Sequence, residues 1–166
     1  PVGIGNPSLE PETVNTIETG FGLEYFVNEN LMLSTSVYRY HAKDLVEFAF
    51  NSSLQASVAQ NIGEQEGKGG EFVMKWKPMT NLTIDANYGY TDAVDEHGVA
   101  TPDIPKHLAF IGANWQINER WNWTVGAKWV GSRQRPELDA RPRLSNYTWV
   151  TSKLLHRSLV EGLDVA

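Results

Sequence analysis

Residues 82–91 read LTIDANYGYT, and this stretch decides the class of fold. Its even positions are Leu, Ile, Ala, Tyr and Tyr, whereas its odd positions are Thr, Asp, Asn, Gly and Thr. Alternation with a period of two predicts a β-strand that has one apolar and one polar face. Alternating runs of this length match the ~9–11 residues of a strand tilted across a bilayer better than the ~5–6 residues of an average soluble strand.

The same alternation recurs along the chain, while the spacing typical of helices is almost absent. Short polar turns separate some strands, and longer irregular connections separate the others. We therefore predict an all-β fold, an antiparallel up-and-down meander with its short turns at one end and about seven strands plus the start of an eighth at 163–166. The further alternating runs are 21–27, 71–77, 109–117 and 121–129, the predicted turns are 28–30, 78–81 and 118–120, and the predicted long connections are 49–60, 93–105 and 131–145.

The composition excludes several classes of protein. A formal net charge of -6 over 166 residues argues against nucleic-acid binding, which needs a basic surface. The chain has no cysteine, which excludes disulfides, thiolate zinc sites and a cysteine nucleophile. It also contains no apolar run near the ~20 residues of a membrane helix, so any contact with a membrane is expected to come from β-structure.

Two features favour lipid outside the sheet over a second layer of protein. The polar face continues through Asp85, Asn87 and Lys128, which suits a water-filled lumen and not a sandwich core. Even positions of 82–90 and odd positions of 121–129 are then expected to face lipid. Aromatic residues also gather near both ends of the predicted strands, as membrane interfaces favour. These predicted interface aromatics are Tyr25, Trp76, Tyr88, Tyr90, Trp115, Trp121, Trp123, Trp129 and Trp149.

Several short motifs resemble the C-terminal part of the β-barrel of TonB-dependent outer-membrane receptors. Residues 6–12 (NPSLEPE) are similar to the family's NPxLKPE, with Glu10 in place of Lys. Asn61 and Gly63, followed by Gly69 and Glu71, match its NxG…GxE spacing. The remaining similarities, in the same order as in the family, are ANYGYTDA at 86–93, PKH at 105–107, VGSR at 130–133 and YTWVT at 147–151, where Thr151 replaces a common Asp.

The resemblance implies a section of a 22-stranded transmembrane β-barrel in the outer membrane of a Gram-negative bacterium, with short turns toward the periplasm. It implies that residues 1–166 are a partial barrel domain, from which the plug domain and the last strand are absent. The family imports large solutes such as ferric siderophores or cobalamin with energy supplied through TonB. Expected partners are the plug, the TonB complex, the chelated-metal solute, outer-membrane lipid and lipopolysaccharide.

No catalytic or metal site is expected. The four histidines are scattered without ligand spacing, and no nucleophile motif occurs. The best candidate for ligand binding is the connection 131–145, because guanidinium groups bind anionic chelates, although its cations could equally be solvated or touch lipid phosphates. The candidate ligand-binding residues on the long loops are Arg133, Arg135, Arg141, Arg143 and His97.

Three functions remain open from the residues alone. The first is a transport receptor with no enzymatic activity and no bound cofactor. The second is a soluble or secreted β-sandwich that acts as a binding module, since alternation alone also fits a sandwich. The third is an outer-membrane β-barrel enzyme.

Overall fold

The computed structural model describes residues 3–25, 30–136, 139–157 and 164–165, and the predicted turn 28–30 therefore lies largely outside the described residues. Every regular element in these ranges is a β-strand, and none is a helix that could cross a membrane. The strands are β1 (Gly3–Ile4), β2 (Thr13–Tyr25), β3 (Leu31–Asn51), β4 (Ala56–Met79), β5 (Leu82–Asp95), β6 (His107–Gln116), β7 (Trp121–Val130), β8 (Tyr147–Arg157) and β9 (Asp164–Val165).

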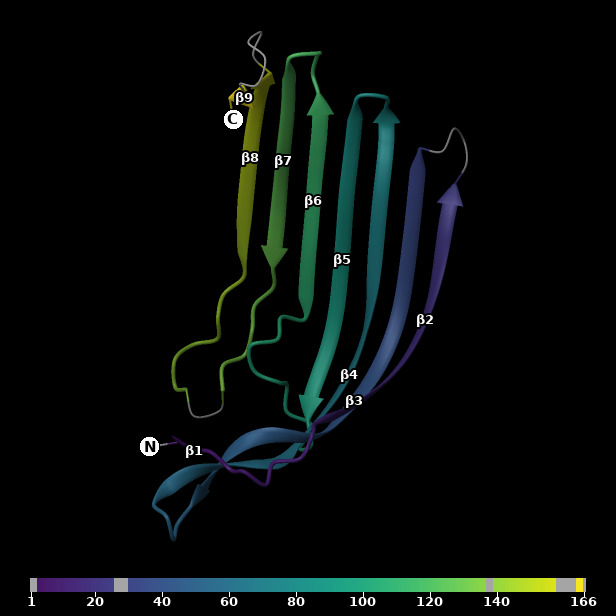
Figure 1. The fold of residues 1–166 in the computed structure, drawn as a ribbon. Coiled ribbons are helices and arrows are strands. Elements are labelled where there is room, and N and C mark those ends of the chain that lie inside the picture. The colour runs from purple at the N-terminus through teal and green to yellow at the C-terminus, as the bar shows by residue number, and fades with distance from the viewer. Residues whose placement is uncertain (1–2, 26–29, 137–138, 158–163, 166) are drawn as a thin grey trace.

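The strands form one sheet in which β2 to β9 lie side by side in chain order (Figure 1). Each neighbouring pair in this path is antiparallel, whereas β1 pairs in parallel with β4. The predicted all-β antiparallel meander is confirmed. In Figure 1 the turns between β4 and β5 and between β6 and β7 lie at one end of the sheet, and the loops after β5 and β7 lie at the other.

The register separates the side chains of the sheet into two faces. Ala86 pairs with Ile111 and Ile111 pairs with Ala127, so the even positions of 82–90 share a face with the odd positions of 121–129, as predicted. We call this the apolar face. Its side chains are strongly exposed, for example Ile17 at 82% and Ile111 at 56%. Because the described sheet leaves this face uncovered, it requires an apolar environment outside the chain.

The opposite, polar face carries Asp85, Asn87 and Lys128, whose partners across the ladder are Lys75, Phe110 and Trp149, respectively. Hydrogen bonds join neighbouring strands on this face, including one of 2.8 Å from the Asn114 amide to the Thr124 hydroxyl. Aromatic rings on this face lie against glycines of the next strand, as the tyrosines of β3 do against β4. The faces therefore differ as a lipid side and a water-filled side would.

Burial gives no sign of a sandwich core. The buried apolar residues in the described ranges are small, four alanines and Val130. The described strands also belong to a single sheet, with no second sheet packed on them. The described strands therefore form a single wall that is held together by ladders of backbone hydrogen bonds. The soluble β-sandwich is not favoured.

One prediction about the loops is wrong. Residues 49–60 were expected to form an irregular connection, but β3 and β4 run through most of this stretch and are joined by the four residues 52–55. With 21 and 24 residues, β3 and β4 are about twice as long as β6 and β7, which have 10 residues each. The extra length forms a twisted hairpin beyond the rest of the sheet, which we call the β3–β4 extension (Figure 1).

A bulge marks the root of this extension. The register shifts between Ala42 and Leu45, and Asp44 has a φ of 58°, a left-handed conformation that Asp tolerates better than most residues. The Asn61 amide donates to the backbone oxygens of Asp44 and Glu10, and its own oxygen accepts from the Glu10 N–H at 2.9 Å. This Asn61 latch joins two stretches, the one containing Glu10 and the one containing Asn61, that resemble family motifs.

Candidate functional site

The loops after β5 and β7 meet beyond the short strand β6. The Asp103 N–H donates to the Gln134 oxygen at 2.9 Å, and the Gly131 N–H donates to the His107 oxygen at 2.9 Å. Within the second loop, Arg133 and Leu144 exchange two backbone hydrogen bonds of 3.0 Å. These hydrogen bonds join the two loops and close the second one near its base, which gives a rim on which ligand-binding side chains can be held in place.

A cavity of about 370 Å³ lies where these loops join the sheet. Three cationic residues line it: Lys106 from the first loop, and Arg133 and Arg143 from the second. Thr101, Ser132 and Asn146 add polar groups to its wall. Lys106 forms an ion pair with Asp92, so in the described residues Arg133 and Arg143 supply the positive charge that suits an anionic ligand.

Arg133 is the strongest candidate in the cavity for binding a ligand. Its guanidinium carbon lies 5.9 Å from the centre of the Tyr147 ring, a distance at which a cation–π interaction holds the group in place. Within the described part of the chain, its Nε atom is buried and has no hydrogen-bond partner. A buried donor without an acceptor costs free energy, so an anion that accepts from this atom would be favoured.

The four predicted loop arginines separate into two pairs. Arg133 and Arg143 line the cavity, whereas Arg135 and Arg141 bind the carboxylate of Asp139. Arg141 donates to Asp139 at 2.6 Å, and hydrogen bonds from Arg141 and the charge of Arg135 lower the pKa of Asp139 from 3.8 to about 2. Arg135 and Arg141 therefore hold the loop together, and the cavity depends on the other two.

The fifth candidate, His97, lies apart from the cavity. It follows β5 in a tight turn, where its N–H donates to the Asp95 carboxylate at 2.9 Å, and its ring is near Glu96. Sequence reasoning did not select Lys106, although it follows a long connection and precedes a strand. Lys106 could have been selected because it is a cation at the boundary between a long loop and a strand, and the next long loop of the chain is rich in arginine.

Two bands of aromatic side chains lie on the apolar face. Toward the short turns are Trp76, Trp115, Trp121 and Trp123; toward the loops are Tyr88, Tyr90 and Trp129. His107 belongs to the second band, since its ring lies 5.2 Å from that of Tyr90 and its Nδ1 is 2.6 Å from the Tyr88 hydroxyl. The register places Tyr25 opposite Leu31 at the end of β2.

Trp149 differs from this set. It pairs with Lys128, so its side chain lies on the polar face and not with the other predicted interface aromatics. The period of two explains the difference, because every residue an odd number of positions from the lipid-facing Val150 points to the other side. We therefore no longer expect Trp149 to contact the lipid interface, and the other aromatics remain predicted interface residues.

A model of the family described as TonB dependent receptor-like, beta-barrel matches residues 2–151. The chain belongs to this family. Its members are transport receptors and not enzymes, and the chain is a piece of outer-membrane β-barrel wall from a Gram-negative bacterium. In the described residues, histidines and carboxylates do not gather into a group that would hold a metal ion.

A curated relative, the iron-regulated outer membrane virulence protein of Vibrio cholerae serotype O1, is 25% identical over 148 residues. The alignment covers 80% of this chain and 22% of the relative, so the chain spans about a fifth of the length of that protein. The wall and loops described here are therefore one section of what a receptor of this kind contains.

Solved receptor structures share the fold. The ferric-catecholate import receptor Fiu from Escherichia coli K12 matches with a TM-score of 0.71 and 19% identity, covering 96% of this chain and 23% of that one. The ferripyoverdine receptor of Pseudomonas aeruginosa matches with a TM-score of 0.71 and 15% identity over 94% of this chain and 22% of that one. At these identities the similarity establishes the fold alone.

Proposed function

We propose that the chain forms barrel wall and surface loops of a receptor that imports a chelated metal, such as a ferric siderophore, or a similar large solute, with energy supplied through TonB. The plug domain and the TonB complex are the expected partners of the whole receptor. Family membership supports active transport, and the curated relative is named as iron-regulated.

The observation that carries the proposal is the cationic cavity at the rim. Arg133 offers a buried Nε that lacks an acceptor in the described residues, and Arg143 and Lys106 stand around the same hollow. Arginine binds carboxylate, catecholate and similar oxygen anions through two parallel N–H groups. At about 370 Å³, the cavity accepts one arm or one face of a large chelate and not the whole solute.

The test uses the complete receptor in a strain that lacks its other iron receptors. Arg133→Gln together with Arg143→Gln is expected to raise the solute concentration for half-maximal uptake about tenfold or more, because each charge-assisted hydrogen bond contributes about 1.5–3 kcal/mol. Uptake is measured with radiolabelled iron on a panel of ferric siderophores, beside labelled cobalamin.

Arg120→Gln is the matched control, because Arg120 is exposed in the short turn at the opposite end of the sheet. It is expected to leave uptake unchanged. Normal uptake by the double variant would show that the cavity is not the binding site. Failure of the unaltered receptor to import any of these solutes would contradict the proposed substrate class itself.

A further inference from the structure

A patch of large apolar side chains interrupts the polar face beside the loops. Two neighbouring rows of the ladder across β6, β7 and β8 form it. The rows are Leu108, Val130 and Tyr147, nearer the loops, and Phe110, Lys128 and Trp149 below them. All of these residues except Lys128 are apolar or aromatic, on the side of the wall that otherwise suits water. We call the two rows the rim patch, and an apolar patch within a polar surface indicates an interaction site.

The aromatic rings of the polar face differ in how they are packed. Phe110 lies against the sheet, since a Cβ at Gly112 would be 2.8 Å from its ring. Tyr38 and Tyr40, which are two positions apart on β3, stack with their ring centres 6.5 Å apart. Trp149 is 67% exposed, and the aromatic pairs of the described residues do not include it. Its ring therefore has a free face on the side opposite to lipid.

The rim patch is continuous with the loop cavity. Gly131 lines the cavity and directly follows Val130, and Asn146 lines it and directly precedes Tyr147. The guanidinium carbon of Arg133 lies 5.9 Å from the centre of the Tyr147 ring, so the same arginine lies beside both. A ligand held in the cavity can therefore extend one group onto the patch.

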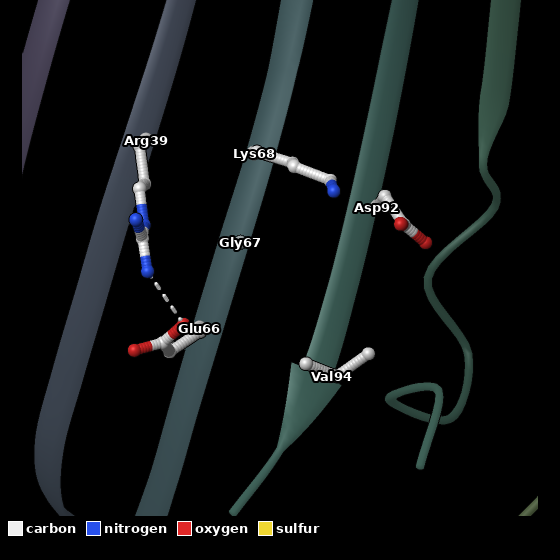
Figure 2. A pocket seen from close by; sticks show the side chains of 6 residues that line it. All are labelled: Arg39, Glu66, Gly67, Lys68, Asp92 and Val94. Carbon is white, nitrogen blue, oxygen red and sulfur yellow. Dashed lines mark hydrogen bonds and ion pairs between the residues drawn. The ribbon is translucent and has the colours of Figure 1, made fainter. Parts of the chain in front are cut away.

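The charged hollow on the apolar face differs from the rim patch, because its charges are balanced within the chain. In this hollow, shown in Figure 2, Arg39 binds Glu66 at 3.0 Å and Lys68 extends toward Asp92. Asp92 is also bound by Lys106, at 2.5 Å. These cations already face carboxylates of the same chain, so this hollow gives no reason to expect an anionic ligand.

The rim patch, in contrast, has a cation that is available. The Lys128 side chain is exposed, and it takes part in none of the ion pairs of the described residues. Lys128 pairs with Trp149 across the ladder, where Cβ atoms are about 4.5–5.5 Å apart. The patch thus has one cation beside Trp149, and Arg133 beside Tyr147.

We propose that Tyr147, Trp149 and Lys128 form a subsite for an aromatic ring with acidic oxygens, such as a phenolate or catecholate arm of the imported chelate. Residues two positions apart on a strand are separated by roughly 6.5–7 Å, which leaves room for one flat ring between the two aromatic side chains. Such a ring stacks on Trp149, and its oxygens accept hydrogen bonds from Lys128 or Arg133. The inference rests on the proposed function and narrows its substrate class.

The test measures binding of two ferric chelates, a catecholate and an aliphatic hydroxamate labelled with radioactive iron, to the complete receptor in detergent. Trp149→Leu keeps an apolar side chain but removes the ring. It is expected to weaken binding of the catecholate about fivefold and to leave binding of the hydroxamate unchanged. Trp149→Phe is expected to recover most of the loss. Trp115→Leu, on the apolar face toward the short turns, is the matched control and should bind like the unaltered receptor.

A second pair of variants tests the charge. Lys128→Gln is expected to weaken binding of the catecholate about fivefold, because a charge-assisted hydrogen bond is lost. Lys153→Gln is its control, since Lys153 is an exposed cation on the same face but nearer the short turns. Folding of every variant is checked by the heat-modifiable band on a gel. Equal effects of Lys128→Gln and Lys153→Gln would overturn the proposal.

The remaining outcomes separate this subsite from the proposed function. An equal loss of both chelates in Trp149→Leu would assign Trp149 to contacts with the plug or the wall, and would overturn the subsite. Unchanged binding of the catecholate by Trp149→Leu would reject the subsite and leave the proposed function standing, and so would an unaltered receptor that binds the hydroxamate alone. Failure of the unaltered receptor to bind or import any chelate would contradict the proposed function itself.

Discussion

The strand pairs β6–β7 and β3–β4 have the same antiparallel ladder but differ in length and in what lies at their loop ends. β6 and β7 have 10 residues each and end close to the aromatic band, where two hydrogen-bonded loops surround a cationic cavity. β3 and β4 continue well beyond that level as the β3–β4 extension. Where the strands end early, the loops that follow them form the candidate site. Where the strands continue, the β3–β4 ladder itself carries charged side chains beyond the level of the aromatic band.

The largest difference between the two pairs is expected when a charge replaces an apolar side chain. Ile111→Arg, at the middle of β6, should cost about 2–4 kcal/mol in the free energy of unfolding, while Val46→Arg in the β3–β4 extension should cost about 0–1 kcal/mol. The measurement is urea unfolding of the complete receptor in phospholipid vesicles. Asn87→Arg, which changes the polar face at a similar depth, is the control and should cost little; equal costs for Ile111→Arg and Val46→Arg would mean that the extension also lies in lipid.

A methyl group added at a glycine of the polar face should give a smaller difference in stability cost between the two strand pairs. A Cβ at Gly69 of β4 would collide with the Tyr90 backbone oxygen and the Tyr38 ring, whereas a Cβ at Gly126 of β7 would lie 3.2 Å from the Phe110 ring. Gly69→Ala is therefore expected to cost about 1–3 kcal/mol, and Gly126→Ala less than about 1 kcal/mol, in the same unfolding assay. A larger cost for Gly126→Ala than for Gly69→Ala would show that the β3–β4 ladder accommodates an added methyl group more readily than the β6–β7 ladder.

The smallest effect is expected in the loop that follows β7. The pKa of Asp139 is lowered to about 2 by Arg141, so its contribution to loop order is present above pH ~4, the ordinary carboxyl pKa, and is lost as the pH falls toward 2. Hydrogen exchange at the Arg141 amide, corrected for its intrinsic dependence on pH, should show the same protection at pH 7 and pH 5. Asp139→Asn should lower this protection at both values, with no change in β3 or β4; a change in protection between pH 7 and pH 5 would contradict the assigned pKa.

Most of the wall was predictable because apolar and polar residues alternate strongly along its strands. Residues 82–91 and 121–129 alternate cleanly, since one side meets lipid and the other water, and the structure keeps both runs on the predicted face. The β3–β4 extension was missed because residues 49–60 show little alternation between apolar and polar positions. These strands are joined by backbone pairing, which does not depend on such a pattern.

The site was predictable only as far as its loop. The cluster of arginines in 131–145 indicated where an anion would bind, but the division between Arg133 with Arg143 and Arg135 with Arg141 depends on how the loop folds around Asp139.

The Asn61 latch has a mechanical consequence. A hairpin held only at its base swings like a lever on a hinge, but this one is fastened near its root by the Asn61 amide and again farther out by β1, which pairs with Ser57 and Val58. With two points of attachment, a sideways load at the tip cannot be relieved by swinging. Tilting of the hairpin would have to break the hydrogen bonds of Asn61 and the pairing of β1 with β4, so we expect the extension to keep its direction relative to the wall.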